Sequence, residues 1–167
     1  MSLNFVPDYW FSTFDEVSAE FLKKLGIKGI LLDIDNTLEP YENAEPSEAV
    51  RAWFFALSEA GISAAFVSNN GRERVERFNK ELGKIAYCKA KKPFPGKIKR
   101  AMREMGVSKS ETLFMGDQIF TDVFAARFAG IRAALVPPIK DKTDVLTRFK
   151  RLLERPIMKC YFRRNKK

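Results

Sequence analysis

Histidine is absent from this chain, and cysteine occurs only twice, at Cys88 and Cys160. Without histidine, a Ser-His-Asp or Cys-His catalytic group and a histidine-ligated zinc site are excluded. The two cysteines follow neither a CxxC spacing nor the pattern of a disulfide framework, so we expect reduced structural thiols. The chemistry open to an enzyme of this composition is therefore mainly that of carboxylates.

Long apolar runs are also missing. No stretch approaches the roughly 18 consecutive apolar residues of a membrane-spanning helix, and the N-terminus lacks the basic-then-apolar pattern of a secretory signal. We therefore expect a cytoplasmic protein. The 167 residues, 46% of them hydrophobic, are enough for a compact domain with a buried core. We predict one domain over residues 1–167.

Segments typical of strands and of helices alternate along the chain, which is the pattern of a parallel sheet with crossover helices. A helix is predicted to begin at a candidate capping box of Thr13 and Glu16 and to end near Gly26. Further helices are predicted at residues 46–61, 72–82, 95–106 and 121–130. Strands are predicted at residues 28–33, 62–67, 84–88, 112–115 and 131–136. We therefore predict an α/β fold, a three-layer Rossmann-like parallel sheet with helices on both faces.

The first predicted strand ends in two aspartates one residue apart, Asp33 and Asp35, followed closely by Thr37. Aspartate also favours turns and helix caps, so the pair by itself leaves a structural role open. Open α/β sheets, however, keep their ligand sites at the carboxyl ends of the strands. Two carboxylates at that place can divide the work of nucleophile and of general acid and base.

Two further segments carry groups that can bind phosphate. Ser68 ends the predicted strand 62–67 and is followed by Asn69 and a glycine-containing turn. A hydroxyl and backbone N–H groups would therefore be available to a phosphate oxygen. Lys92 precedes Pro93, which favours an extended loop at the lysine. Taken singly, a helix cap and a solvated lysine are the ordinary interpretations of Ser68 and Lys92.

A later strand breaks at Asp117, and a helix resumes near Asp122. With Asp33 and Asp35, these aspartates would place four negative charges at one edge of the sheet. Two carboxylates about 4 Å apart repel by about 4 kcal/mol at an effective dielectric constant of about 20, so the cluster requires a cation. Mg²⁺ prefers carboxylate ligands, and Lys92 would neutralise part of the remaining charge.

The order of these motifs resembles that of the haloacid dehalogenase superfamily of phosphohydrolases. DxDxT, a serine after the second strand, Lys-Pro and GDxxxTD follow one another between residues 28 and 137. Within the superfamily, the segments GIKGILLDIDNTLEPY, VSNN, AKKPFPGK and GDQIFTDV are most similar to the capless subclass IIIA branch known as YqeG. That branch is related to the phosphatidylglycerophosphate phosphatases of mitochondria and plastids.

The resemblance implies chemical roles for the acidic residues. Asp33 would be the nucleophile that becomes an aspartyl-phosphate. Asp35 would protonate the leaving alcohol and later activate water, and would offer its backbone carbonyl to Mg²⁺. Asp117 would be the direct metal ligand, so that Asp33, Asp35 and Asp117 form the metal site. Thr37 would brace the loop.

The resemblance also implies how phosphate is held. Ser68, Asn69 and Lys92 would bind the transferring phosphoryl group, and Lys92 would bridge it to the nucleophile. Asp122 would be a second acidic partner that holds water, lysine or metal. The choice of Lys92 over Lys89 or Lys91 rests on the Lys-Pro pairing.

The spacing of the motifs leaves little room for an insertion. Between Asp35 and Ser68, and between Ser68 and Lys92, the chain can hold one helix with a loop or short strand. Independently folded units usually need about 50 residues, so we predict no cap domain and an open site. Such a site accepts bulky phosphorylated groups as readily as small metabolites. The resemblance suggests phosphatidylglycerophosphate; soluble sugar phosphates, nucleotides and phosphoproteins are the alternatives.

The C-terminal segment 148–167 is strongly basic. It contains nine basic residues and one acidic residue, in a chain of formal net charge +9. Apolar residues, among them Tyr161 and Phe162, interleave with the charges. A solvated helix face is the ordinary interpretation. An anionic membrane surface, which would hold the enzyme at the inner face of a membrane, is the sharper interpretation, and a nucleic acid is the least favoured.

Two functions of other classes remain open. A receiver-like signalling domain also combines clustered aspartates with a hydroxyl and a Lys-Pro loop. It differs in placing its acidic pair first and its phosphoacceptor on a later strand, without DxD. The second alternative is a non-catalytic binding module on the same fold, which the presence of every expected catalytic residue disfavours.

Overall fold

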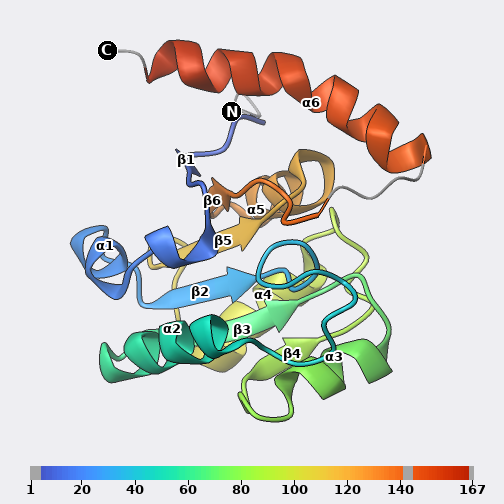
Figure 1. Cartoon of the computed structure of the whole chain (residues 1–167). Helices are drawn as coiled ribbons and strands as arrows, with labels where there is room; N and C mark the ends of the chain where they lie inside the picture. The colour runs from blue at the N-terminus through green and yellow to red at the C-terminus, as the bar shows by residue number, and fades with distance from the viewer. Residues whose placement is uncertain (1–4, 141–144, 166–167) are drawn as a thin grey trace.

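The computed structural model describes residues 5–140 and 145–165 (Figure 1). One sheet contains six parallel strands in the order β1-β6-β5-β2-β3-β4. These strands are β1 (Tyr9–Trp10), β2 (Gly29–Leu32), β3 (Ser63–Val67), β4 (Ile85–Tyr87), β5 (Thr112–Gly116) and β6 (Arg132–Leu135). The five strands predicted from the sequence are all present, each within one residue of the predicted ends. The prediction of an α/β fold with a parallel sheet is confirmed.

Helices cover both faces of the sheet, as Figure 1 shows. One core cluster joins α1 (Ala19–Lys24), α2 (Glu48–Glu59) and α3 (Arg72–Asn79) to the sheet. The opposite cluster joins α4 (Gly96–Met105), the π-helical turn η2 (Ile119–Val123) and α5 (Phe124–Ala129). In β2, Ile30 and Leu32 belong to the first cluster and Leu31 to the second. Successive side chains of a strand point to opposite faces, so an unbroken apolar strand is buried on both sides.

The N-terminal region differs from the prediction. Thr13 makes no capping bond, and η1 (Phe14–Glu16) is only a single 3₁₀ turn. The helix begins instead after Ser18, whose hydroxyl oxygen accepts the N–H of Phe21 at 3.1 Å. The chain leaves the helical path at Val17, because this side chain is fully buried in the core and its carbonyl accepts a hydrogen bond from the Trp53 indole at 2.9 Å. Tertiary packing here overrides the local capping signal.

Strand β1 was not predicted, because two residues are too few to show an alternating pattern. Tyr9 pairs with Ala134 and Trp10 with Leu135, which extends the sheet beyond β6. The preceding Asp8 reinforces this edge: its carboxylate accepts the backbone N–H of Ala133 at 2.7 Å and forms a 2.8 Å ion pair with Arg127.

The last helix, α6 (Val145–Arg164), lies along one side of the molecule beyond β1 and α5 (Figure 1). Glu154 is buried, and its carboxylate accepts the N–H of Ile119 in η2 at 2.8 Å. Ile157 and Met158 pack against the core, and the Phe162 ring meets Trp10 edge-on at 5.6 Å. The predicted basic segment is therefore, in part, a helix docked on the fold.

The basic side chains of α6 fall into two groups. Arg155, Lys159, Arg163 and Arg164 are exposed. The other five predicted basic residues lie outside the described side chains: Arg148, Lys150, Arg151, Lys166 and Lys167. Among the helices that the structure describes, none is both long and apolar enough to cross a membrane.

Candidate active site

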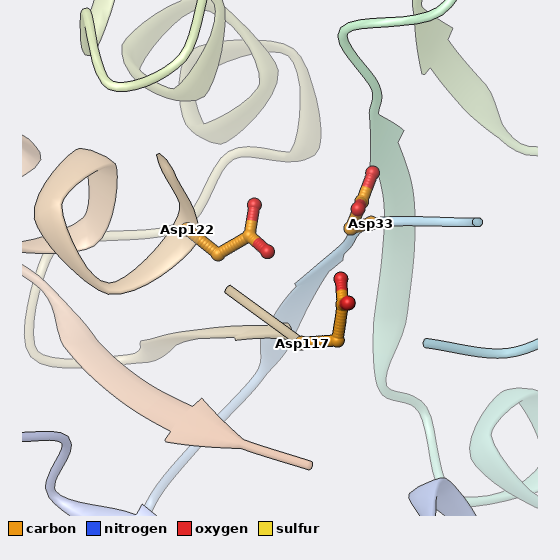
Figure 2. Close-up of side chains that lie close together, drawn as sticks. All are labelled: Asp33, Asp117 and Asp122. Carbon is orange, nitrogen blue, oxygen red and sulfur yellow. The ribbon is translucent and has the colours of Figure 1, made fainter. Parts of the chain in front are cut away.

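Three of the predicted aspartates converge at the carboxyl ends of two neighbouring strands (Figure 2). Asp33 follows β2, Asp117 follows β5, and Asp122 belongs to η2. The N–H of Asp33 donates to Met115 in β5 at 3.0 Å, which fixes the two strand ends side by side. Oxygen atoms of the three buried carboxylates lie within 4.8 Å of one another. The strand order reverses between β2 and β5, the place where open α/β sheets bind ligands.

Lys92 lies inside this cluster. Its ammonium nitrogen is 3.0 Å from Asp33 Oδ1 and 2.7 Å from Asp122 Oδ1. Burial by itself would lower the pKa of Lys92, but the charges of Asp122 and Asp33 outweigh it and raise that pKa above its ordinary value. Lys92 therefore stays a cation between the two carboxylates. Lys89 and Lys91, the two lysines not chosen from the sequence, are both exposed.

Asp33 is a weaker acid than an ordinary aspartate. Burial raises its pKa to about 6; Lys92 opposes the rise, whereas the nearby charge of Asp122 adds to it. Removal of a carboxylate from water disfavours its charged form. In the metal-free protein, the predicted nucleophile therefore takes up a proton when the pH falls below about 6.

Asp122 is held in place from two sides. Its Oδ1 contacts Lys92, and its Oδ2 accepts the N–H of Gln118 at 3.0 Å. A side chain at Gly116 would collide with it, because an added Cβ would lie 2.3 Å from Asp122 Oδ2. Only glycine at residue 116 lets η2 fold back this closely over the end of β5.

The loops that carry Ser68 and Lys92 are bonded to each other. Asn69 accepts the N–H of Lys92 at 2.7 Å through its side-chain oxygen and donates to the Lys92 carbonyl at 3.3 Å. The N–H of Ala90 donates to Ser68 O at 2.9 Å. The backbone of Lys91, beside them, has φ +57°, a strained conformation for a residue other than glycine. Asn69 was predicted to bind phosphate. Its side-chain amide instead positions the lysine loop.

The carboxylate of Asp35 is not part of this group of three, although its charge still acts on Asp33. Its Oδ1 accepts from Arg74 Nε at 3.0 Å, and its Oδ2 accepts from Asn70 Nδ2 at 2.5 Å. The predicted group of four aspartates is therefore a group of three, with Asp35 bound to α3. Arg74 and Asn70 were missed in the sequence, although a cation in the first turn of a helix is itself unusual, because the helix dipole disfavours it.

The donor set fits a hard divalent cation. Buried carboxylate oxygens are the ligands that such ions prefer. Because both oxygens of Asp122 are engaged, Asp33 and Asp117 are the better placed carboxylates to bind a cation. The hydroxyl of Thr37 lies 3.5 Å from Asp117 Oδ1. Thr37, which was predicted to support the loop after β2, therefore contacts the neighbouring carboxylate.

Sequence comparisons point to one family. Residues 12–136 match the family described as haloacid dehalogenase-like hydrolase. The Bacillus subtilis (strain 168) protein named "Probable phosphatase YqeG" is 34% identical over 160 residues, which cover 96% of this chain and 93% of that protein. The Arabidopsis thaliana protein named "Phosphatidylglycerophosphate phosphatase 1, chloroplastic/mitochondrial" is 28% identical over 168 residues, which cover 90% of this chain but only 46% of the plant protein.

A solved structure shares the fold. The cobalt-bound deoxy-D-mannose-octulosonate 8-phosphate phosphatase of Haemophilus influenzae superposes with a TM-score of 0.55 at 21% identity, covering 68% of this chain and 70% of that chain. The sheet, the carboxylate site and the named relatives define the enzyme class as a phosphatase. The chain belongs to the haloacid dehalogenase-like hydrolase family, as its motifs predicted.

Replacement of Gly116 by alanine should displace Asp122 and, through it, Lys92. We expect Gly116→Ala to lower phosphatase kcat by about 10- to 100-fold, because small displacements of positioned groups have effects of this size. The control is Gly71→Ala, since a Cβ at that residue meets nothing within 4 Å. Steady-state kinetics and melting temperatures of both variants test the expectation; unchanged activity of a folded Gly116→Ala enzyme would contradict it.

Binding of Mg²⁺ should depend on pH because of Asp33. A carboxyl whose pKa is raised by folding holds its proton more tightly in the folded state, so its contribution makes the metal-free protein less stable as pH rises from about 4 to about 6. The cation binds the ionised form. We expect Mg²⁺ to raise the melting temperature by several degrees at pH 7.5 and by much less at pH 5.

The comparison variant for this measurement is Asp117→Asn, which removes the charge of one of the three clustered carboxylates. Thermal unfolding with and without Mg²⁺ should show little stabilisation of that variant at either pH. Equal stabilisation of the wild-type protein at pH 5 and pH 7.5 would mean that the cation does not bind at Asp33.

Proposed function

We propose that this phosphatase is a Mg²⁺-dependent phosphomonoester hydrolase that works through an aspartyl-phosphate on Asp33. The buried contact of Lys92 with Asp33 and Asp122 is the main support. A carboxylate and a phosphate dianion repel each other, and a fixed cation beside the carboxylate relieves this repulsion. Mg²⁺, when bound, would add positive charge at the phosphoryl oxygens.

In the first step, a carboxylate oxygen of Asp33 bonds to phosphorus while the bond from phosphorus to the leaving oxygen breaks. Asp35 donates its proton to that oxygen, so the alcohol leaves neutral. The phosphoryl group is then carried as an acyl phosphate on Asp33.

In the second step, water attacks the acyl phosphate. Asp35, now a carboxylate, takes a proton from the water as the water oxygen bonds to phosphorus and the bond to Asp33 breaks. Inorganic phosphate leaves, and both carboxyl groups return to their starting protonation states.

Residues around the two aspartates would hold the phosphoryl group. Ser68 Oγ accepts the N–H of Asn70 at 3.1 Å, which leaves its own proton to donate to a phosphoryl oxygen. Asn69 would contribute its backbone N–H, because its side chain is bonded to Lys92. Lys92 would contact phosphate and nucleophile together, and Asp33, Asp117 and the backbone carbonyl of Asp35 would bind Mg²⁺.

An open site on a single domain suits a large substrate. The loops between β2 and α2 and between β3 and α3 are far shorter than the roughly 50 residues of an independent unit, so we infer one domain over residues 1–167 without a cap. Three side chains on loops near the site are strongly exposed: Tyr41 (50%), Phe94 (71%) and Ile139 (50%). These side chains would be available to contact a lipid surface.

We infer that phosphatidylglycerophosphate in a membrane is the substrate, consistent with the name of the plant relative. A soluble sugar phosphate, a nucleotide or a phosphoprotein is the alternative. The test offers the purified enzyme phosphatidylglycerophosphate in micelles beside soluble phosphomonoesters, with Mg²⁺ or with EDTA. Phosphate release should require Mg²⁺ and should be fastest from the lipid; a faster soluble substrate would identify the alternative.

Asp33→Asn is the control that tests the mechanism, since an amide cannot form the acyl phosphate. We expect turnover of every substrate to fall by at least about 10³-fold, the scale seen when a nucleophile is removed. Circular dichroism should show an intact fold. Near-wild-type turnover by this variant would contradict the covalent mechanism.

Helix α6 would hold the enzyme at an anionic membrane through its exposed basic side chains. Truncation is a poor test, because it would also remove Ile157, Met158 and Phe162, which pack on the fold. Replacement of the four exposed bases by glutamine leaves these contacts in place. The four residues are Arg155, Lys159, Arg163 and Arg164.

We expect this fourfold variant to bind vesicles containing anionic lipid at least about tenfold more weakly, since each basic residue near such a surface contributes up to about 1 kcal/mol. Hydrolysis of a soluble phosphate should not change. A variant with four exposed lysines neutralised elsewhere controls for net charge: Lys23, Lys24, Lys80 and Lys99. Vesicle cosedimentation at two salt concentrations measures the effect. Equal binding of the two variants would mean that the basic side chains of α6 have no specific role in membrane binding.

A further inference from the structure

Asp35 is bound on both of its carboxylate oxygens, by Arg74, which lies outside the phosphate-binding motifs, and by Asn70, which ends the VSNN segment. Arg74 Nε donates to Oδ1 at 3.0 Å, and Asn70 Nδ2 donates to Oδ2 at 2.5 Å. A carboxylate oxygen has about two acceptor positions, so one position on each oxygen stays open to a proton or to a leaving group. The carboxylate is thus fixed without being blocked.

Arg74 is itself held rigidly. Its Nη1 donates to the carbonyl of Ala44 at 3.1 Å, and the guanidinium lies 5.3 Å from the Phe78 ring centre and 5.9 Å from that of Tyr41. The arginine side chain is 12% exposed and that of Asp35 only 9%. A planar guanidinium fixed on several sides holds a carboxylate in one orientation.

Helix stability does not account for Arg74. It is the third residue of α3, after the N-cap Gly71, where the helix dipole disfavours a cation. Arg72 in the same turn is 77% exposed and only reaches Glu76, at 3.7 Å. Arg74 instead turns back across the loop towards Asp35.

Direct binding of phosphate does not account for Arg74 either. Its Nη2 is buried and makes no hydrogen bond to any residue that the structure describes. The nitrogen atoms that do make bonds are directed at Asp35 and at Ala44. A substrate could not reach the guanidinium without displacing these contacts.

We propose that Arg74 is a positioning residue that holds Asp35 in line with the leaving oxygen, with Asn70 as its helper. The proposal rests on the proposed function, in which Asp35 is the acid and base. Proton transfer requires donor and acceptor at about 2.6–3.2 Å, and the hydrogen bonds from Arg74 and Asn70 are what fix the position of the Asp35 carboxylate. Loss of Arg74 therefore affects the step that depends on Asp35 and leaves binding of the phosphoryl group unchanged.

The experiment compares Arg74→Met and Arg74→Lys with wild type on an alkyl phosphate and on p-nitrophenyl phosphate. Arg74→Met should lower kcat/KM for the alkyl phosphate by about 10- to 100-fold, because kcat/KM reports formation of the acyl phosphate, in which Asp35 acts as the acid. For the aryl phosphate, whose leaving group needs little protonation, the loss of kcat/KM should be less than about threefold. Hydrolysis of the acyl phosphate, in which Asp35 acts as the base, is common to both substrates and is followed separately through kcat. Arg74→Lys should recover only part of the loss, since lysine cannot donate to Asp35 and to Ala44 together.

The matched control is Arg72→Met, which removes an exposed arginine from the same helical turn and should behave as wild type. Asn70→Ala removes only the hydrogen bond from Asn70 to Asp35. It should lower activity on the alkyl phosphate less than Arg74→Met does, and it provides the test if Arg74→Met does not fold. In an Asp35→Asn background, Arg74→Met should cause little further loss, because residues that act through one group are not additive.

Three results would overturn the proposal. Equal losses of kcat/KM on both substrates would mean that Arg74 has only a structural role. A raised KM with unchanged kcat would mean that Arg74 binds the substrate. Full additivity with Asp35→Asn would mean that it does not act through Asp35. Inactivity of the wild-type enzyme on all phosphomonoesters would contradict the proposed function itself, and the wild-type measurement reveals this before any variant is compared.

Discussion

The balance of buried charge governs this site. Asp33, Asp117 and Asp122 bring up to three negative charges within 4.8 Å of one another at a place shielded from water. At an effective dielectric constant of about 20, each such pair repels by roughly 3 kcal/mol. Lys92 relieves part of this repulsion. The pKa of Asp33 is nevertheless raised, mainly because burial removes the carboxylate from water and to a smaller extent because of the charge of Asp122. A further positive charge would favour the ionised form of Asp33 down to lower pH and would relieve more of the repulsion within the cluster.

The order of the strands brings these mutually repelling carboxylates together. β2 lies between β5 and β3, so one strand end stands beside the loops that carry Asp117, Ser68 and Lys92. Two features of the surrounding backbone accompany this arrangement of loops. Gly116 allows η2 to pack closely over the end of β5, and Lys91 adopts a strained conformation beside Lys92. Core packing on both faces of the sheet supplies the stability that offsets these local demands.

Much of the fold and most of the site could be predicted from the sequence, because the relevant residues follow strands whose apolar runs are easy to see. Asp33, Ser68 and Asp117 are found this way. Arg74 and Asn70 could not be, since their partner Asp35 is joined to them only by folding of the loops. The two hydrogen bonds that engage the carboxylate of Asp35 were hidden for the same reason.

Other differences came from packing that overrides local signals. The capping box at Thr13 and Glu16 has the right residues, but burial of Val17 takes the chain out of the helix. Strand β1 is too short to show an alternating pattern of apolar and polar residues. It forms because β6 would otherwise be an edge strand with unpaired backbone groups. For Asn69 the prediction found the right loop, whereas the amide is used to hold Lys92.

The parallel pairing of β2 with β5 has a consequence for how the protein is made. Strands of this kind join residues far apart in the sequence, and such contacts form late in folding. While a ribosome is still adding the second half of the chain, Asp33 has neither Asp117 nor Asp122 beside it. A nascent chain therefore lacks the carboxylate group that would capture a metal ion, and the enzyme gains its reactive centre only when synthesis has passed η2 and the sheet can close.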